Sequence, residues 1–213
     1  MRKTCSVLLI AAVFLSFGWM GAASAVHQNC CHPSVPKSGS SAALATTSAR
    51  PMSSLNAEDV RKEFNASSQK VRVVALLSPA CADCQSGHGV VGRVLKKFPS
   101  PKLKAILVWE PMRDGDNATS ATQQAETVQD IRVSQGWDGG QNLGKVFGQT
   151  LDLHQIAWDV YLVYKPGIKW EGPQPPRPTF WMHQLEGVDP KLLLCENPTR
   201  LNVEVGKLLA QTD

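Results

Sequence analysis

Two cysteines three positions apart, Cys81 and Cys84, are the residues of this sequence whose type and spacing best suit chemistry. They follow a nearly continuous aliphatic run, 71–77, and precede a stretch in which apolar residues recur at helical spacing. The first sulfur is therefore expected at the start of a helix, where free backbone N–H groups and the helix dipole stabilise a thiolate and lower its pKa. We expect Cys81 to be the attacking thiol and Cys84 the resolving thiol within disulfide reach.

The residues between the cysteines tune the pair. Asp83 lies directly before Cys84. A carboxylate this close disfavours a second negative charge, which raises the pKa of the thiols and makes the pair less oxidising than a basic insert would. The insert therefore favours a reducing or isomerising pair over a strong oxidase.

The same cysteines allow two other interpretations. One is a structural disulfide that fixes the start of the helix. The other is a metal site in which His88, one helical turn after Cys84, is a third ligand. Structural zinc usually takes four protein ligands, and no second cysteine pair of suitable spacing follows. We therefore expect His88 to be a solvent-facing helix residue, and neither a metal nor an organic cofactor to be needed.

The elements that must position the pair follow from the pattern of apolar residues. Buried strands are predicted at 71–77 and 104–109, and two further aromatic-rich strands at 158–164 and 179–185. Capping residues and helical spacing predict helices over about 56–65, from the cysteine pair to 98, over 122–133, over 141–147, and from Pro198 to the last residues. Strand, helix and strand in succession predict a right-handed parallel unit, and hence an α/β fold.

This order of elements, with C-x-x-C at the first strand-to-helix junction, resembles the thioredoxin superfamily over roughly residues 55 to 211. The resemblance implies a thioredoxin-like three-layer sandwich, with a mixed central sheet flanked by helices, and a site where Cys81 and Cys84 exchange disulfides with protein thiols. Two positions depart from the family pattern. Ala80 stands where thioredoxins usually carry tryptophan, and Pro178 is the nearest candidate for the cis-proline that faces the dithiol in that family.

Topology brings further side chains to the sheet edge that carries the dithiol, since strand ends share that edge. These rim residues are Trp109, Glu110, Trp158, Asp159 and His183. They are expected to form an aromatic and titratable surface that grips an extended substrate or relays a proton. Tryptophans are equally typical of ordinary strand cores, and a histidine is often only a satisfied hydrogen-bond partner.

Residues 1–25 have the features of a secretory signal peptide, with a basic start, an apolar stretch over 7–19 and an A-x-A cleavage site ending at Ala25. The apolar stretch is shorter than the about 20 residues that span a membrane. We expect an exported protein, periplasmic or extracellular, that is attached to a membrane only if the leader is retained. The formal charge of +4 falls to +2 without Arg2 and Lys3, which does not favour a nucleic-acid partner.

Residues 26–53 are rich in Ser, Ala, Thr and Pro, and are predicted to be a disordered linker that leads to a domain over 54–213. The linker carries the vicinal pair Cys30 and Cys31, followed by His32. This cluster could bind zinc, copper or mercury, or be a stray oxidation site. Cys195, before the last helix, is expected to be a small buried apolar residue.

Three functions from different classes are compatible with the sequence. The first is an exported thiol-disulfide oxidoreductase of reductase or isomerase type, whose partners are protein thiols or disulfides and an unidentified electron donor. The second is a protein that handles a soft metal ion through the same cysteines. The third is a redox-inert binding module on the same scaffold.

Overall fold

The structure, a computed structural model, describes residues 51–212. The predicted signal peptide, most of the predicted linker and the cluster at Cys30, Cys31 and His32 lie outside these residues. The described elements are, in order, α1 (Ala57–Ala66), β1 (Val71–Leu77), α2 (Ala82–Lys97), β2 (Leu103–Trp109), α3 (Ala118–Ala125), β3 (Val133–Trp137), α4 (Asn142–Thr150), β4 (Val160–Tyr164), β5 (Phe180–His183), the 3-10 helix η1 (Pro190–Leu192) and α5 (Arg200–Ala210).

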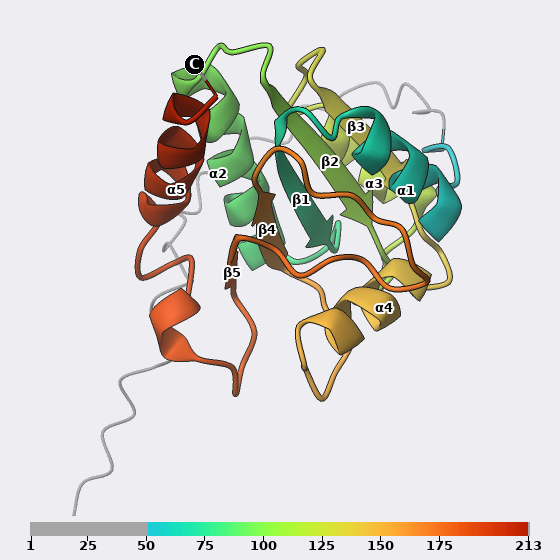
Figure 1. The fold of residues 1–213 in the computed structure, drawn as a ribbon. Helices are drawn as coiled ribbons and strands as arrows, with labels where there is room; N and C mark the ends of the chain where they lie inside the picture. The colour runs from blue at the N-terminus through green and yellow to red at the C-terminus, as the bar shows by residue number, and fades with distance from the viewer. Residues whose placement is uncertain (1–50, 213) are drawn as a thin grey trace, which may run out of the picture. The chain divides into compact units, whose positions relative to one another are not determined.

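The strands form one mixed sheet in the order β3-β2-β1-β4-β5. β1 pairs in parallel with β2, and β2 in parallel with β3, whereas β4 runs antiparallel to both β1 and β5. β1 is therefore the central strand, and all seven of its residues are buried. Figure 1 shows β1 between β2 and β4. Because the chain passes from the end of β1 into the cysteine pair, the pair lies at the carboxyl end of the central strand.

Alternate residues of β1 enter two different cores, because successive side chains of a strand point to opposite faces. Val73 and Ala75 pack in a core that includes buried residues of α2 and α5. Val74 and Leu76 pack in a second core that includes buried residues of α1 and α4. Figure 1 shows α2 and α5 side by side on one side of the sheet. The result is the predicted three-layer α/β arrangement with a mixed sheet between helices.

The start of the packed chain agrees closely with its sequence pattern. Asn56 and Asp59 form a capping box at the beginning of α1, in which each side chain accepts the backbone N–H of the other. Just before this helix, Ser53 and Leu55 pair with Trp137 through backbone hydrogen bonds of 3.0 and 2.8 Å. The packed region therefore begins slightly before residue 54.

Several predicted boundaries are wrong. The helix predicted over 122–133 ends at Ala125, and an unpredicted strand, β3, follows it. Among the five strands of the sheet, β3 pairs only with β2, and four of its five residues are only half-buried, so it lacks the apolar run of a central strand. The last helix begins at Arg200 rather than Pro198, after a turn in which the Arg200 N–H donates to the Asn197 carbonyl. The described residues contain no cis peptide bond, so the bond before Pro178 is trans.

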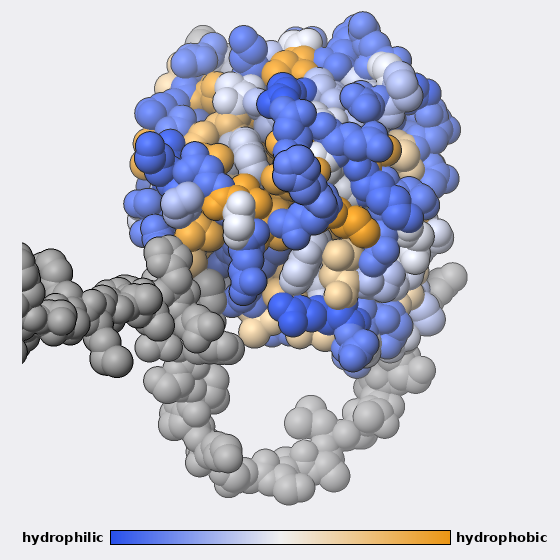
Figure 2. Space-filling model, turned by 90° about the horizontal axis from the view of Figure 1, so that it is seen from below, coloured by the Kyte–Doolittle hydropathy of each residue, from blue (hydrophilic) through white to orange (hydrophobic). Residues whose placement is uncertain are grey.

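The surface of the described part is mostly hydrophilic. Figure 2 shows hydrophobic residues reaching one face in several separate places among hydrophilic ones. Ile131 and Val203 are the large hydrophobic residues that are most exposed. None of the helices within residues 51–212 combines the length and the apolar character that crossing a bilayer requires.

Candidate functional site

The cysteine pair lies where the sequence pattern predicts it, at the start of the helix that follows the central strand. Cys81 is the N-cap residue of α2, and its Sγ accepts the backbone N–H of Cys84 at 3.3 Å. Both cysteines are free thiols in the structure. The helix start therefore directs an N–H group at the Cys81 sulfur, which is the arrangement that stabilises a thiolate.

The two thiols have opposite environments. Hydrogen bonds from the thiol and then the backbone N–H of Cys84 lower the pKa of Cys81 below its ordinary value of 9.0, in spite of its burial. Burial raises the pKa of Cys84 well above the same value. Cys81 is 4% exposed and Cys84 is fully enclosed. Cys81 is thus the thiol that ionises first and the one that retains a route to solvent.

Asp159 is a buried acidic residue beside the dithiol. It is buried directly before β4, and its Oδ2 lies 3.9 Å from the Sγ of Cys81. Its Oδ1 accepts hydrogen bonds from the Tyr161 hydroxyl at 2.6 Å and the Gln184 side-chain amide at 3.0 Å. Burial raises the pKa of Asp159. A carboxyl group with one oxygen anchored and the other facing sulfur is suited to moving a proton to or from a thiol.

Gln184 also connects Asp159 to the cysteine loop. Its side-chain amide donates to the backbone carbonyl of Asp83 at 2.7 Å, in addition to its bond with Asp159. This single amide therefore joins the residue after β5, the residue before β4 and the first turn of α2. Gln184 thus links the Asp159 carboxylate to the backbone of the segment that carries the two sulfurs.

Asp116 holds the loop that leads into the dithiol. Its carboxylate accepts the Ser78 hydroxyl and the Ala80 N–H, both at 2.7 Å. It also accepts the backbone N–H groups of Met112 and Arg113, at 2.9 and 2.8 Å, so it ties the β1–α2 loop to the β2–α3 loop. These bonds give the Ser78 hydroxyl and the Ala80 N–H a partner and connect the loop before Cys81 to the neighbouring loop.

Most of the residues predicted to form an exposed rim around the dithiol are buried. Asp159 meets the dithiol as expected, and Trp158 is half-buried, with the Arg113 guanidinium 5.3 Å from the centre of its ring. Trp109, Glu110 and His183 are fully buried, so the expectation that they grip a substrate is wrong. They are enclosed because the strand ends that carry them are covered by neighbouring helices and loops.

Each of these three buried residues has its own structural partners. The Trp109 indole N–H donates to the Gln135 side chain at 3.1 Å. The Nε2 of His183 lies 3.0 Å from the Asp189 carbonyl, and its Nδ1 accepts the N–H of Leu185 at 3.0 Å. Both ring nitrogens are thus engaged, which makes this histidine a satisfied partner and not a proton relay.

Glu110 is a second buried acid, away from the sulfurs and at the start of α4. Its Oε1 accepts the N–H of Gly144 at 2.7 Å. Its Oε2 is buried and has no hydrogen-bond partner within residues 51–212. Burial, and after it the nearby Asp138 carboxylate, raise the pKa of Glu110 to about 8, although the Gly144 bond opposes the shift. Glu110 therefore carries a proton over much of the neutral pH range.

His88 does not face solvent, contrary to the prediction. It is 1% exposed, its Nδ1 lies 3.1 Å from the Thr127 hydroxyl, and its ring meets Trp109 edge-on at 5.1 Å. Burial lowers its pKa to about 4. His88 lies on the buried face of α2, together with Cys84, Val91 and Leu95, which recur at helical spacing. Cys195 is half-buried instead of fully buried.

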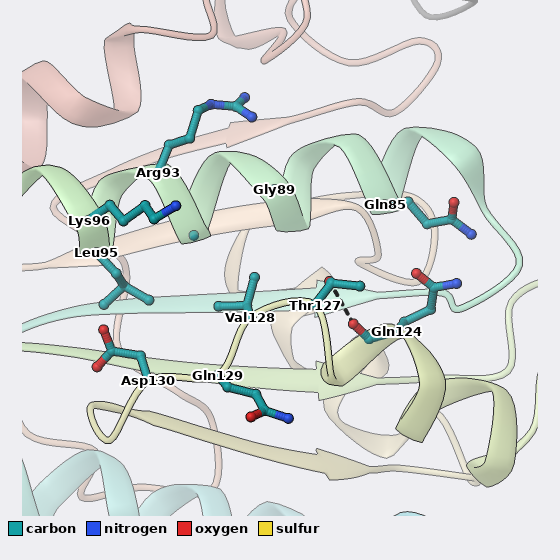
Figure 3. Close-up of a pocket in the computed structure, with 11 residues that line it drawn as sticks. Gln85, Gly89, Arg93, Leu95, Lys96, Gln124, Thr127, Val128, Gln129 and Asp130 are labelled. Atoms are coloured by element: carbon teal, nitrogen blue, oxygen red, sulfur yellow. Dashed lines mark hydrogen bonds between the residues drawn. The ribbon is translucent and has the colours of Figure 1, made fainter. Parts of the chain in front are cut away.

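A surface hollow of about 510 Å³ runs along α2 beyond the cysteines (Figure 3). Arg93 and Lys96 line it from α2, and Thr127 and Asp130 line it from the segment between α3 and β3. Gln85, directly after Cys84, lines the same hollow. Neither sulfur belongs to its lining, so the hollow is a neighbour of the dithiol and not the reaction site.

Three functional residues escaped the sequence analysis or were placed without a role. Tyr161 and Gln184 orient Asp159, and Asp116 fixes the loop before Cys81. The separation of 78 residues between Cys81 and Asp159 shows why spacing alone could not connect them. The only available signal was topological, in that Asp159 precedes a strand antiparallel to β1.

Comparisons with known proteins give likenesses of fold. A thioredoxin-like protein solved in its oxidised form is 16% identical, with a TM-score of 0.47, covering 79% of this chain and 100% of that one. The MTB protein DsbF is 13% identical, with a TM-score of 0.39, covering 68% of this chain and 84% of that one. A secreted Mycobacterium tuberculosis disulfide oxidoreductase homologous to E. coli DsbE is 12% identical, with a TM-score of 0.41, covering 67% and 86%.

No protein-family model and no curated protein matches the chain. The mixed five-stranded sheet flanked by helices agrees with the fold that the resemblance predicted. At 12–16% identity and TM-scores of 0.39–0.47, these likenesses say nothing of a substrate or of the direction of a reaction. Those have to come from the geometry around the sulfurs.

Proposed function

We propose that this chain is a thiol-disulfide oxidoreductase in which Cys81 is the nucleophile and Cys84 the resolving thiol. The observation that carries the proposal is the contrast between the two sulfurs at the start of α2. One has a lowered pKa and slight exposure, and the other a raised pKa and full burial. A structural disulfide would require no such contrast, since both of its sulfurs are uncharged.

The exchange proceeds in two balanced steps. The Cys81 thiolate attacks one sulfur of a substrate disulfide, so that a mixed disulfide forms while the substrate S–S bond breaks, and the leaving thiolate takes a proton from water. Cys84 then loses its proton and attacks the Sγ of Cys81, which releases the second substrate thiol. The substrate gains two electrons, and the protein is left with the Cys81–Cys84 disulfide.

Asp159 is the group suited to the second step. Cys84 is enclosed and its thiol resists ionisation, so its attack requires a nearby proton acceptor. Asp159 lies with both sulfurs in a group whose ligand atoms are within 4.8 Å of one another. Because burial raises the pKa of Asp159, this pKa is closer to the pKa of a thiol than the pKa of an exposed carboxyl group is. A smaller difference between the two pKa values favours proton transfer between the groups.

The acidic surroundings support a reductase or isomerase rather than a strong oxidase. Asp83 lies between the cysteines, and the charge of Asp159 raises the pKa of both. Groups that disfavour the thiolate destabilise the ionised reduced form, and strong oxidants of this kind depend on stabilising that form. A reduction potential near that of strong oxidants, about −120 mV, would contradict this assignment.

The reaction needs no organic cofactor, and its partners are protein thiols or disulfides together with a thiol-based electron donor. We propose that it takes place outside the cytoplasm, on the strength of the predicted leader over residues 1–25. An exported location suits the chemistry, because disulfides persist in oxidising compartments.

Insulin reduction in the presence of a dithiol reductant tests the proposal. The wild-type chain is expected to accelerate the reduction, and Cys81→Ser to reduce the rate to the uncatalysed background. Cys195→Ser is the matched control, since it removes a half-buried thiol outside the pair, and it should keep the wild-type rate. Equal rates for wild type and Cys81→Ser would reject the enzymatic function and leave a redox-inert binding module.

A further inference from the structure

The sulfurs of Cys81 and Cys84 and a carboxylate oxygen of Asp159 form a group of potential metal ligands. The three atoms lie within 4.8 Å of one another, and all three residues are buried. A tetrahedral ion with bonds of about 2.3 Å to sulfur and about 2.1 Å to oxygen holds such atoms roughly 3.5 to 3.8 Å apart. The Cys81 Sγ and Asp159 Oδ2 are already 3.9 Å apart, so small side-chain movements would suffice.

The surroundings of Asp159 have the form of a second coordination shell. Tyr161 and Gln184 both donate to Oδ1, which leaves Oδ2 directed at the sulfurs. Outer partners of this kind fix the orientation of a ligating carboxylate and are a regular feature of metal sites. Tyr161 is fully buried, and this bond gives its hydroxyl a partner beside the group.

The backbone at Asp159 adds an independent observation. Its φ of 51° lies in the left-handed region, which a residue with a side chain rarely adopts. Conformations of this kind cost free energy and persist where the surrounding structure enforces them, often at functional sites. At this position, the conformation presents the carboxylate to a dithiol that comes from a different part of the chain.

We propose that the reduced Cys81–Cys84 pair and Asp159 bind one zinc-like divalent cation. Two thiolates exclude magnesium and calcium, which prefer oxygen ligands, while the carboxylate disfavours copper(I), which prefers sulfur. Two sulfurs and one oxygen suit zinc, with a fourth position left for water or an outside ligand. His88, the third ligand of the alternative metal interpretation, is engaged with Thr127 and is not part of the group.

This inference rests on the proposed function because it uses the same dithiol, and it adds a form of regulation. A bound cation occupies the Cys81 thiolate and prevents its attack on a disulfide. Disulfide formation in turn excludes the cation: once the cation has left, the two thiolates give two electrons to a substrate disulfide, which takes two protons from solvent to form two thiols, and the resulting Cys81–Cys84 disulfide has no thiolate to bind a divalent ion. Metal binding and disulfide formation are therefore mutually exclusive.

A zinc titration of the full chain, reduced and freed of reductant under anaerobic conditions, tests the site. The chain carries serine in place of Cys5, Cys30, Cys31 and Cys195, so that only the thiols of Cys81 and Cys84 remain. Competition with a chromophoric chelator is expected to show one zinc ion per reduced chain and none per oxidised chain. Zinc should also protect Cys81 from alkylation, and cobalt(II) should give sulfur-to-metal charge-transfer absorption.

Two variants and a control identify the third ligand. Asp159→Asn should weaken zinc binding by at least about 100-fold, and Tyr161→Phe, which removes only an outer hydrogen bond, by about 10-fold. Asp114→Asn removes the same charge from an exposed residue outside the group and should bind close to wild type. Thermal unfolding of each reduced, metal-free variant checks that it is folded.

Equal zinc affinity in Asp159→Asn and Asp114→Asn, or equal binding by the oxidised chain, would overturn the metal site. Insulin reduction in the presence of a chelator is measured on the same preparations. Activity without zinc binding would remove the metal site alone, and zinc binding without activity would remove the proposed oxidoreductase and leave the metal site standing.

Discussion

The hydroxyl of Tyr161 occupies the space that a side chain at Gly87 would fill. A Cβ built at Gly87 would lie 1.7 Å from the Tyr161 oxygen, far inside contact distance. Gly87 is in α2, one turn after Cys84, so the helix lacks a side chain where Tyr161 passes to reach Asp159. The pair shows that the orientation of the buried acid depends on a glycine in the helix that carries the dithiol.

Gly87→Ala is therefore expected to displace Tyr161 and to lower the free energy of unfolding by about 1 to 3 kcal/mol, the usual cost of overpacking a core. Gly89→Ala is the matched control, because the nearest atom to its added Cβ is the flexible end of Arg93, at 3.5 Å. That variant should be stabilised by about 0.5 to 1 kcal/mol, as alanine favours a helix. Urea unfolding measures both, and equal effects of the two substitutions would show that Tyr161 does not depend on Gly87.

The pH dependence of alkylation tests the electrostatics at Cys81. In a chain whose cysteines at 5, 30, 31 and 195 are serine and whose Cys84 is retained, iodoacetamide labelling of Cys81 is followed by peptide mass spectrometry, and its rate should rise with a midpoint below pH 9.0, the ordinary thiol pKa. Asp159→Asn should move this midpoint to lower pH, because the Asp159 charge raises the pKa of Cys81. Asp114→Asn, which neutralises an exposed carboxylate, is the control. A midpoint that stays in place or rises in Asp159→Asn is incompatible with the described arrangement.

The raised pKa of Glu110 makes the free energy of unfolding decrease as the pH rises. Its pKa rises from 4.5 to about 8 on burial, so between these values the folded chain holds a proton that the unfolded chain has released. The free energy of unfolding therefore falls as pH rises through this window, by up to about 1.4 kcal/mol per pH unit. The contribution is complete below about pH 4.5 and is lost by about pH 8.

Glu110→Gln should reduce this slope, since the amide cannot ionise and can still accept the Gly144 N–H. Part of the slope should persist, because burial also raises the pKa of Asp159. Urea unfolding across the window compares the variant with wild type and with Glu171→Gln, a substitution at an exposed residue. An unchanged slope in Glu110→Gln would mean that Glu110 is ionised in the folded protein.

The sequence was informative where local patterns decide structure. The aliphatic run at β1 and the cysteines behind it determine the strand-to-helix junction, and the structure confirms Cys81 as the N-cap of α2. The edge strand β3 could not be predicted in this way, since its polar residues Ser134 and Gln135 have no apolar periodicity. Its position depends on pairing with β2, which is a long-range property.

The site was predictable only in part for the same reason. Asp159 could be assigned to the correct sheet edge from topology, but its left-handed backbone and its bonds to Tyr161 and Gln184 depend on packing. The burial of His88 was open to prediction, since His88 lies three residues before Val91 and seven before Leu95, on the apolar face of α2. Spacing identifies the sulfurs, and the tertiary structure supplies the group that handles their protons.

The most direct test of the central claim is to trap the mixed disulfide. Cys84→Ser, in a chain whose cysteines at 5, 30, 31 and 195 are also serine, is incubated with oxidised glutathione and analysed by intact and peptide mass spectrometry. We expect one glutathione per chain, attached to Cys81 and persistent because no resolving thiol remains. Absence of this adduct, or equally rapid labelling of Cys84 in the reciprocal Cys81→Ser chain, would contradict the assignment of Cys81 as the attacking thiol.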